Sequence, residues 1–289
     1  MPGVLDIQIR DPYVFEHGGC YYLYGSTDTD IWKADGVGFD VYIAEDAALA
    51  EFDGPRPAFR PPEGFWSRKN FWAPEVYGYG GKFYMFATFL PVLGRRGTAV
   101  LRAESPLGPF EPWSAGPVTP PEWECLDGTL YIEGGKPYMI FCHEWKDLGD
   151  GQICAIPLSE DLRSAAGEAK TLFSASEAPW ADPLPGRPGC YVTDGPNLYR
   201  SENGALLMLW SSFHKGKYAI GLASCADGRL SGPWRQAEKP LYSDDGGHGM
   251  LFKKSGGLFL AIHSPNNTPC ERARFLEILE EDGRLSVLG

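Results

Sequence analysis

Three aspartates stand before short apolar runs at widely separated points of the chain. They are Asp11 in RDPYVF, Asp127 in DGTLYI and Asp194 in DGPNLY. An aspartate before glycine or proline is ordinarily a turn residue, but the last two stretches are near copies of each other. Glu75 in FWAPEV and Glu144 in CHEW add to the acidic set. If the fold brings these carboxyl groups together, they could hold a cation or carry out acid–base chemistry.

A repeat supplies a fold that would bring them together. Five segments share a polar head, a short strand, a turn with glycine (HGG, YGG, EGG, ENG, SGG) and an aromatic-rich second strand. Glycine in these turns allows the positive φ of a hairpin. We take the heads as Asp11, Glu75, Asp127, Asp194 and His248. Their spacing of roughly 50 to 70 residues suits one four-stranded unit and an elaborated loop.

This periodicity predicts an all-β fold, a five-bladed β-propeller that uses residues 1–289 as a single domain. Third strands are expected at DVYIAED, TAVLRAES, QICAIPLSED and YAIGLASCAD, and SPLGPFEPW and GRLSGPWRQ are matching closing turns. A β-sandwich also contains alternating hairpins. Its hairpins do not usually carry a polar residue at the same place in every unit, so the pattern favours the propeller.

In a propeller the first strand of each blade lines the central channel, so the five heads converge at one end of it. The second strands run back to the same face. They would bring further polar and aromatic side chains to the rim, with Trp72 nearby: His143, Trp145, His214 and His263. Carboxylates on different blades, facing each other across a funnel, suit two groups on either side of a scissile glycosidic bond. A tight oxygen cage for a metal is the competing interpretation.

The composition excludes several partners. A net charge of -12 over 289 residues argues against a nucleic-acid backbone or an anionic membrane as ligand. Seven scattered cysteines without C-x-x-C spacing indicate neither a disulfide framework nor a zinc site. The start, MPGVLDIQIRDP, has no signal-peptide pattern, and no run of eighteen apolar residues occurs. We therefore expect a cytoplasmic protein that is a monomer or a small homo-oligomer.

Taken together, RDPYVF, FWAPEV, DGTLY, DGPNLY and GGHGM resemble glycoside hydrolase family 43, from Asp11 to about Asn266. The resemblance implies inverting hydrolysis of arabinose-, xylose- or galactose-containing oligosaccharides, of arabinofuranosidase or xylosidase type. The missing signal-peptide pattern favours small imported oligosaccharides as substrates and therefore exo action. It also implies three roles. Asp11 would be the general base, Asp127 the residue that positions the acid and sets its pKa, and Asp194 would occupy the general-acid position.

At that last position the chain departs from the family, whose acid is usually a glutamate. Three explanations stay open: Asp194 is the acid in a reshaped pocket, Glu144 reaches in as the acid, or the site is degraded and the protein only binds glycans. The resemblance makes Glu75 a substrate contact and structural element. It places His248 near a central Ca²⁺ or Na⁺, although a site without an ion fits a single histidine equally well, and no cofactor is required. A phosphorylase would need a basic pocket, for which only Arg10 and His248 stand at the heads.

Overall fold

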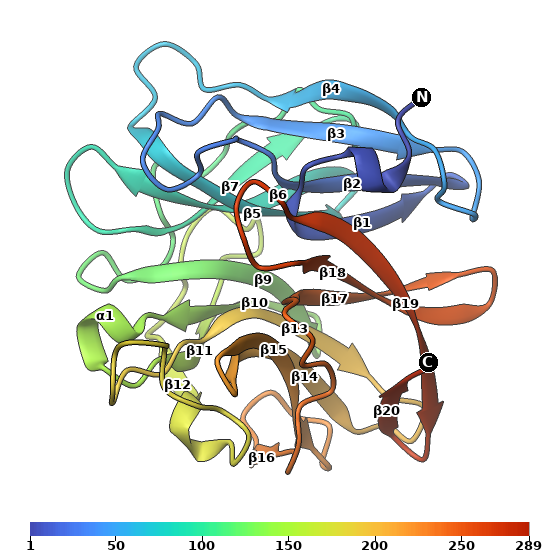
Figure 1. The fold of residues 1–289 in the computed structure, drawn as a ribbon. Coiled ribbons are helices and arrows are strands. Elements are labelled where there is room, and N and C mark those ends of the chain that lie inside the picture. The colour runs from blue at the N-terminus through green and yellow to red at the C-terminus, as the bar shows by residue number, and fades with distance from the viewer. Residues whose placement is uncertain (289) are drawn as a thin grey trace.

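The computed structural model describes residues 1–288, in which twenty strands form five antiparallel sheets of four strands. The sheets follow one another along the chain, and each pairs its strands in sequence order from the first strand to the fourth. Figure 1 shows the five sheets as successive colours from blue to red, arranged as the blades of a propeller. The predicted five-bladed β-propeller is confirmed.

The strands of each blade have the following bounds. Blade one contains β1 (Arg10–His17), β2 (Cys20–Ser26), β3 (Phe39–Ala44) and β4 (Asp53–Phe59). Blade two contains β5 (Ser67–Tyr79), β6 (Lys82–Pro91), β7 (Gly97–Ala103) and β8 (Glu111–Pro112). Blade three contains β9 (Cys125–Glu133), β10 (Lys136–His143), β11 (Gln152–Pro157) and β12 (Lys170–Ser174). Blade four contains β13 (Asp194–Arg200), β14 (Leu206–His214), β15 (Lys217–Cys225) and β16 (Arg235–Gln236). Blade five contains β17 (Gly247–Lys254), β18 (Gly257–Ser264), β19 (Arg272–Glu281) and β20 (Arg284–Val287).

The turn between the first two strands of each blade has the predicted chemistry. Each of these turns contains a glycine with a positive φ. The φ is 81° at Gly19 in blade one and also at Gly256 in blade five. The second strands that follow are largely buried, because the faces of a blade pack against its neighbours. The matching closing turns lead into the very short outer strands β8 and β16.

Helix is confined to three short segments of the described chain. They are the 3-10 turns η1 (Val4–Asp6) and η2 (Ala175–Glu177), and the single-turn helix α1 (Trp145–Leu148) at the end of β10. No helix within residues 1–288 has the length and apolar character needed to cross a membrane. All seven cysteines are free thiols, as their spacing predicted.

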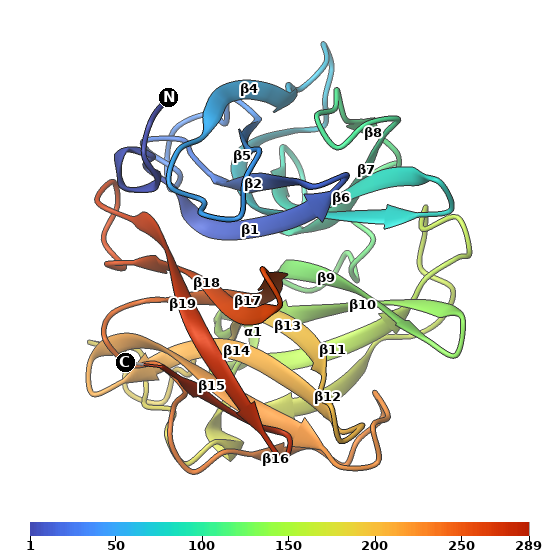
Figure 2. The same ribbon diagram turned by 90° about the vertical axis from the view of Figure 1, so that its right-hand side faces the viewer.

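Blades one and five close the ring without sharing a strand. Figure 2 shows β1 beside the red strands of blade five. The segment before β1 runs along the start of β19: Gln8 forms a bridge with Arg272, and the Ile9 N–H donates to the Glu271 carbonyl at 3.2 Å. This seam between the first and last blades runs past Arg10 and Asp11, so the closure of the ring also shapes the site.

Candidate active site

Each first strand contains the same irregularity at the same place. In all five blades the pairing with the second strand shifts register just inside the head of the strand. One residue of each shift has a positive φ between 46° and 56°: Asp11, Ala73, Asp127, Gly195 and His248. We call these five the channel positions. A bulge of this kind re-aims a side chain, and here it acts on three residues predicted from sequence as catalytic or ion-binding.

The register shifts correct two of the five predicted heads. The residue before each channel position pairs with the second strand, which defines a set of rim positions: Arg10, Trp72, Leu126, Asp194 and Gly247. Asp194 is therefore a rim residue, and Gly195 is the equivalent of Asp127. Glu75 lies two residues inside the channel position Ala73. The two Asp-Gly copies are offset by one residue, because blade four has one more residue (DGPNLY against DGTLY) before the matching Leu-Tyr.

A cavity of about 830 Å³ opens at this end of the channel, and residues from all five blades line it. Among its lining residues are seven of the predicted site residues: Asp11, Trp72, Asp127, Glu144, Trp145, Asp194 and His248. The cavity thus gathers all four predicted catalytic carboxyl groups from blades one, three and four.

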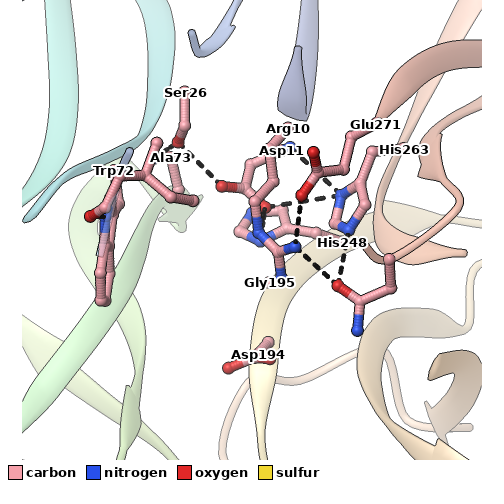
Figure 3. Close-up of polar contacts among 12 residues, drawn as sticks. Arg10, Asp11, Ser26, Trp72, Ala73, Asp194, Gly195, His248, His263 and Glu271 are labelled. Carbon is pink, nitrogen blue, oxygen red and sulfur yellow. Dashed lines mark hydrogen bonds and ion pairs between the residues drawn. The ribbon is translucent and has the colours of Figure 1, made fainter. Parts of the chain in front are cut away.

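Asp11 lies at the centre of a dense polar cluster (Figure 3). Its Oδ2 accepts the Ser26 hydroxyl at 2.8 Å, and its Oδ1 lies 3.2 Å from Nδ1 of His248. Burial alone would raise the pKa of Asp11, but protonated His248 and the Arg10 guanidinium outweigh it and hold the pKa well below its usual range. Asp11 is therefore ionised at any working pH, as a general base requires.

His248 supplies the positive charge of the cluster. Burial lowers the pKa of an imidazole, but Asp11 and Asp127 on either side raise that of His248 to about 10. Its Nδ1 lies 3.5 Å from Oδ2 of Asp127. A protonated Nδ1 between two carboxylates cannot bind a cation. No group of three His, Cys, Asp or Glu suited to a metal occurs in residues 1–288. A Ca²⁺ or Na⁺ near His248 stays a prediction.

Asp127 and Asp194 form the second acidic group of the cavity. The N–H of Gly195 donates to Oδ2 of Asp127 at 2.9 Å, which holds Asp127 beside the backbone that carries Asp194. Burial is the main cause that raises the pKa of Asp127 to about 8; His248 opposes it and the Asp194 carboxylate adds to it. Burial also raises the pKa of Asp194, against the Tyr218 hydroxyl, which donates to its Oδ2 at 2.8 Å. In Figure 3 Asp194 stands apart from the Asp11 cluster, below Gly195.

Gly195 is the one channel position without a side chain, and the reason is steric. A Cβ there would lie 2.8 Å from two ring atoms of His248. The missing side chain makes room for the imidazole that faces Asp11 and Asp127. The glycine also keeps the φ of 51° free of strain.

Glu144 lines the same cavity, directly before α1. Its Oε2 lies 3.3 Å from Nη1 of Arg96 and 3.4 Å from Nζ of Lys146. Burial raises the pKa of Glu144, while both cations lower it. Two cations within ion-pair distance favour the ionised carboxylate, but burial outweighs them and the pKa of Glu144 stays above its ordinary value.

Trp72 and Trp32 both line the cavity but differ in how far their rings are exposed. Trp72 is 8% exposed: Arg96 lies over its ring at 4.5 Å, and its indole N–H donates to the Ile31 carbonyl at 2.7 Å. Trp32, which packs edge-on against it at 5.2 Å, is 50% exposed and also lines the cavity. Trp32, which the sequence did not single out, therefore has the more accessible ring for stacking on a sugar.

Four predicted substrate contacts are not among the lining residues of the cavity: Glu75, His143, His214 and His263. Glu75 lies deeper in the channel, where its carboxylate bonds the Tyr77 hydroxyl and burial raises its pKa to about 7. His143 stacks on Trp123 at 4.2 Å and bonds Asp147, while Nδ1 of His214 lies 2.8 Å from the Trp180 carbonyl. The second strands do return to this face, but the side chains of His143 and His214 contact neighbouring loops and do not line the cavity.

His263 belongs to a ring of contacts between successive blades. The second-strand residue paired with each rim position faces the channel position of the next blade; these anchor positions are Ser26, Thr88, Cys142, Ser211 and His263. Three hydroxyls accept the channel N–H at 2.8 to 2.9 Å: Ser26 from Ala73, Thr88 from Asp127, and Ser211 from His248. His263 closes the ring, since its Nδ1 accepts the Asp11 N–H at 3.2 Å.

Several cavity residues were not predicted from the sequence. Besides Trp32, they include Asn70, Arg96, Lys146 and Tyr218. Most stand in or beside loops between strands, where the repeat gives no register. Arg10 had a usable signal, because it occupies a rim position directly before Asp11.

The comparisons with known proteins agree with this geometry. The family model described as "Glycosyl hydrolases family 43" matches residues 3–282. An endo-arabinase from Bacteroides thetaiotaomicron is 40% identical, with a TM-score of 0.90 and 98% of each chain covered. A thermostable family-43 glycoside hydrolase is 27% identical, with a TM-score of 0.82 over 98% of this chain and 93% of that one. An endo-1,4-beta-xylanase, also from B. thetaiotaomicron, is 26% identical, with a TM-score of 0.76 over 98% and 95%.

A search of curated proteins found no match for this chain. The family match covers nearly all of its length, and the structure at 40% identity covers as much. The chain belongs to glycosyl hydrolase family 43 and is a glycosidase.

Proposed function

We propose that this glycosidase hydrolyses α-L-arabinofuranosidic bonds at the ends of arabinan-type oligosaccharides, with inversion at the anomeric carbon. Asp11 is the general base, Asp194 the general acid, and Asp127 the residue that positions and tunes the acid. The observation that carries this proposal is the cavity itself, where an ionised Asp11 on blade one faces the Asp127–Asp194 pair on blades three and four.

The roles follow from the protonation states. Asp11 is ionised and can take a proton from a water below the sugar ring. Asp194 is partly buried, has a raised pKa and can keep a proton for the leaving oxygen. Two carboxyl groups that interact share protons as a pair. The pKa of both is raised, so the pair holds a proton near neutral pH, and the proton on Asp194 is the one that is given to the leaving oxygen. This division of roles suits a mechanism in which water enters between base and acid.

Asp194 is preferred over Glu144 as the acid because of their neighbours. Glu144 lies within 3.4 Å of the cations Arg96 and Lys146. Asp194 accepts from the neutral Tyr218 hydroxyl and forms no ion pair within residues 1–288, although Arg10 and His248 act on it from farther away. Residues from every blade line the cavity around these groups. This surrounding wall supports a pocket that binds the end of an oligosaccharide chain. The arabinose preference rests on the similarity to the endo-arabinase at 40% identity.

The test is a substrate screen followed by product analysis. Nitrophenyl α-L-arabinofuranoside, β-D-xyloside and β-D-galactoside are compared for kcat/KM, and proton NMR follows the first-formed anomer. We expect the arabinofuranoside to be the best substrate and the first product to have inverted configuration. An unbranched arabinan oligosaccharide should release the monosaccharide first.

Three results would change the proposal. Early release of intermediate lengths would replace exo with endo action. A preference for the xyloside or galactoside would change the sugar. Binding of oligosaccharide without turnover of any glycoside would favour a glycan-binding propeller with a degraded acid.

A further inference from the structure

One of the five anchor positions does not accept the N–H of the next channel position. Ser26, Thr88 and Ser211 offer a hydroxyl to the N–H of the next channel position, and His263 offers a ring nitrogen. The fifth anchor position is Cys142, paired with the rim residue Leu126 on β9. The channel residue that follows it is Gly195, whose N–H donates to Asp127 at 2.9 Å instead.

This exception, Cys142, belongs to the part of the ring that contains Asp127 and Asp194. Gly195 directly follows Asp194, so its bond to Asp127 joins blade three to blade four at the proposed acid. Cys142 has no exposed surface and is absent from the cavity lining, so it touches neither substrate nor reacting atoms. Burial holds the pKa of its thiol far above its ordinary value, so the group stays neutral.

A thiol is a weak acceptor, whereas a hydroxyl in the same ring position is a good one. The distances at Ser26 and Ser211, 2.9 and 2.8 Å, show that a serine side chain reaches the next channel N–H in this geometry. A serine at position 142 would therefore compete with Asp127 for the Gly195 N–H. A cysteine leaves that donor to the carboxylate.

We propose that Cys142 is a positioning residue, whose lack of a hydroxyl reserves the Gly195 N–H for Asp127 and so holds that carboxyl group beside Asp194. The inference rests on the proposed function, because it assumes that the Asp127–Asp194 pair supplies the catalytic proton.

The consequence for catalysis follows from the shared proton. The charged groups that face Asp127 from the elements packed against it are Asp11 on β1, Asp194 on β13 and His248 on β17. Those that face Asp194 from elsewhere are Arg10 and His248, with Glu144 at the cavity mouth. None of these changes with residue 142. The Gly195 bond lowers the pKa of Asp127, so its loss raises that pKa further. More of the proton that the pair shares then lies on Asp127, and the acid is less often ready.

The experiment compares Cys142→Ser with Cys142→Ala in the full chain, with nitrophenyl α-L-arabinofuranoside and an arabinan oligosaccharide. Alanine removes the thiol without adding an acceptor, so we expect its pH profile to match the wild type. For serine we expect kcat/KM on the oligosaccharide about tenfold lower, as for a pKa displaced by about one unit. The basic limb of its profile should also move to higher pH. A crystal structure of Cys142→Ser should show the serine hydroxyl on the Gly195 N–H.

Failure of this inference is distinct from failure of the proposed function. If the wild type hydrolyses the arabinofuranoside but the two variants have the same profile, the role of Cys142 is refuted and the function stands. The role is equally refuted if the new hydroxyl turns to Thr193, the other polar neighbour of this position, and leaves Gly195 on Asp127. If the wild type turns over none of the three nitrophenyl glycosides, the proposed function fails. In that case the crystal structure still decides which group receives the Gly195 N–H.

Discussion

Nδ1 of His248 lies 3.2 Å from Oδ1 of Asp11, although the two residues come from the last and the first blades of the propeller. The contact spans the seam at which the ring closes without a shared strand. It makes an imidazolium the counter-ion of the proposed base, and it couples closure of the ring to the charge state of the site.

The first prediction concerns stability as a function of pH. The pKa of His248 is raised from 6.5 to about 10 in the folded protein, so its stabilising contribution is complete below about pH 6.5 and is lost as the pH rises through about 10. We therefore expect the unfolding free energy of the wild type to fall across this window. His248→Asn, which tolerates the positive φ and keeps a neutral donor, should show a flatter dependence in urea titrations at pH 6, 8 and 10.

Asp127 acts in the same direction over a lower window, so a second variant separates the two groups. Its pKa is raised from 3.8 to about 8, and the associated stability is lost as the pH rises between these values. Asp127→Asn should remove the slope below about pH 6.5, where Asp127 acts alone, reduce it between 6.5 and 8, and leave the slope above pH 8. An unchanged slope above pH 8 in His248→Asn would refute the role of His248 as the counter-ion.

The second prediction is that Asp11→Asn abolishes hydrolysis while the fold stays intact. Removal of a general base costs typically about 10² to 10⁴ in rate. Asparagine tolerates the left-handed φ of 55° at this position and can still accept the Ser26 hydroxyl. The protein should therefore still fold, with a lower unfolding midpoint from the lost His248 ion pair, while kcat collapses. Full activity of this variant would refute the assignment of the base.

The third prediction separates the two candidate acids by the leaving group. A nitrophenolate leaves without protonation, whereas a sugar alcohol needs the acid. We expect Asp194→Asn to lose about 10² or more in kcat on an arabinan oligosaccharide and far less on the nitrophenyl arabinofuranoside. Glu144→Gln should affect both substrates alike. The opposite pattern would assign the proton to Glu144 and its ion pairs to substrate binding.

The repeat makes the fold predictable, because five hairpins with glycine turns and polar heads recur in register. It also predicts the channel end at which Asp11, Asp127 and His248 meet. The repeat does not predict which residue of a strand start faces the channel. Asp127 and Asp194 both stand in an Asp-Gly pair, yet Asp127 is a channel position and Asp194 a rim position. A bulge that shifts register by one residue leaves no mark in hydrophobic alternation.

Side chains from loops are the other part that the sequence left undetermined. Arg96 reaches Trp72 and Glu144 from the connection between β6 and β7, and Trp32 enters from the connection between β2 and β3. Their positions depend on tertiary contacts such as the 3.3 Å bond from the Trp32 indole N–H to Thr268 on the blade-five side. The local sequence pattern gives no information about a contact between residues that lie so far apart in the chain.

The fourth prediction distinguishes Trp32 from Trp72. Trp32 has an exposed ring at the cavity, so Trp32→Ala should raise KM threefold to about tenfold with kcat nearly unchanged, the range expected for loss of one aromatic contact. Trp72 is buried between Arg96 and Ile31, so Trp72→Phe should mainly lower the unfolding temperature. If Trp32→Ala leaves KM unchanged for oligosaccharide and aryl substrate alike, Trp32 makes no stacking contact.

The fifth prediction tests how His263 holds the base. Its Nδ1 accepts the Asp11 N–H, and its Nε2 lies 3.4 Å from Oδ1 of Asn266, which also receives Nη1 of Arg10 at 2.6 Å. Burial and the nearby Arg10 lower the pKa of His263 to about 3, so the ring is neutral and its Nδ1 is free to accept. The two ring nitrogens thus have separable tasks.

Two amide variants probe these tasks one at a time. His263→Asn places an oxygen near the position of Nδ1 and can still accept the Asp11 N–H, while His263→Gln places its amide near the position of Nε2. If the acceptor positions the base, kcat should fall about tenfold or more in His263→Gln and far less in His263→Asn, the loss expected when a base is misplaced. KM should change little in either variant. Equal losses of kcat in the two variants, in step with equal losses of thermal stability, would reduce His263 to a packing residue of the seam.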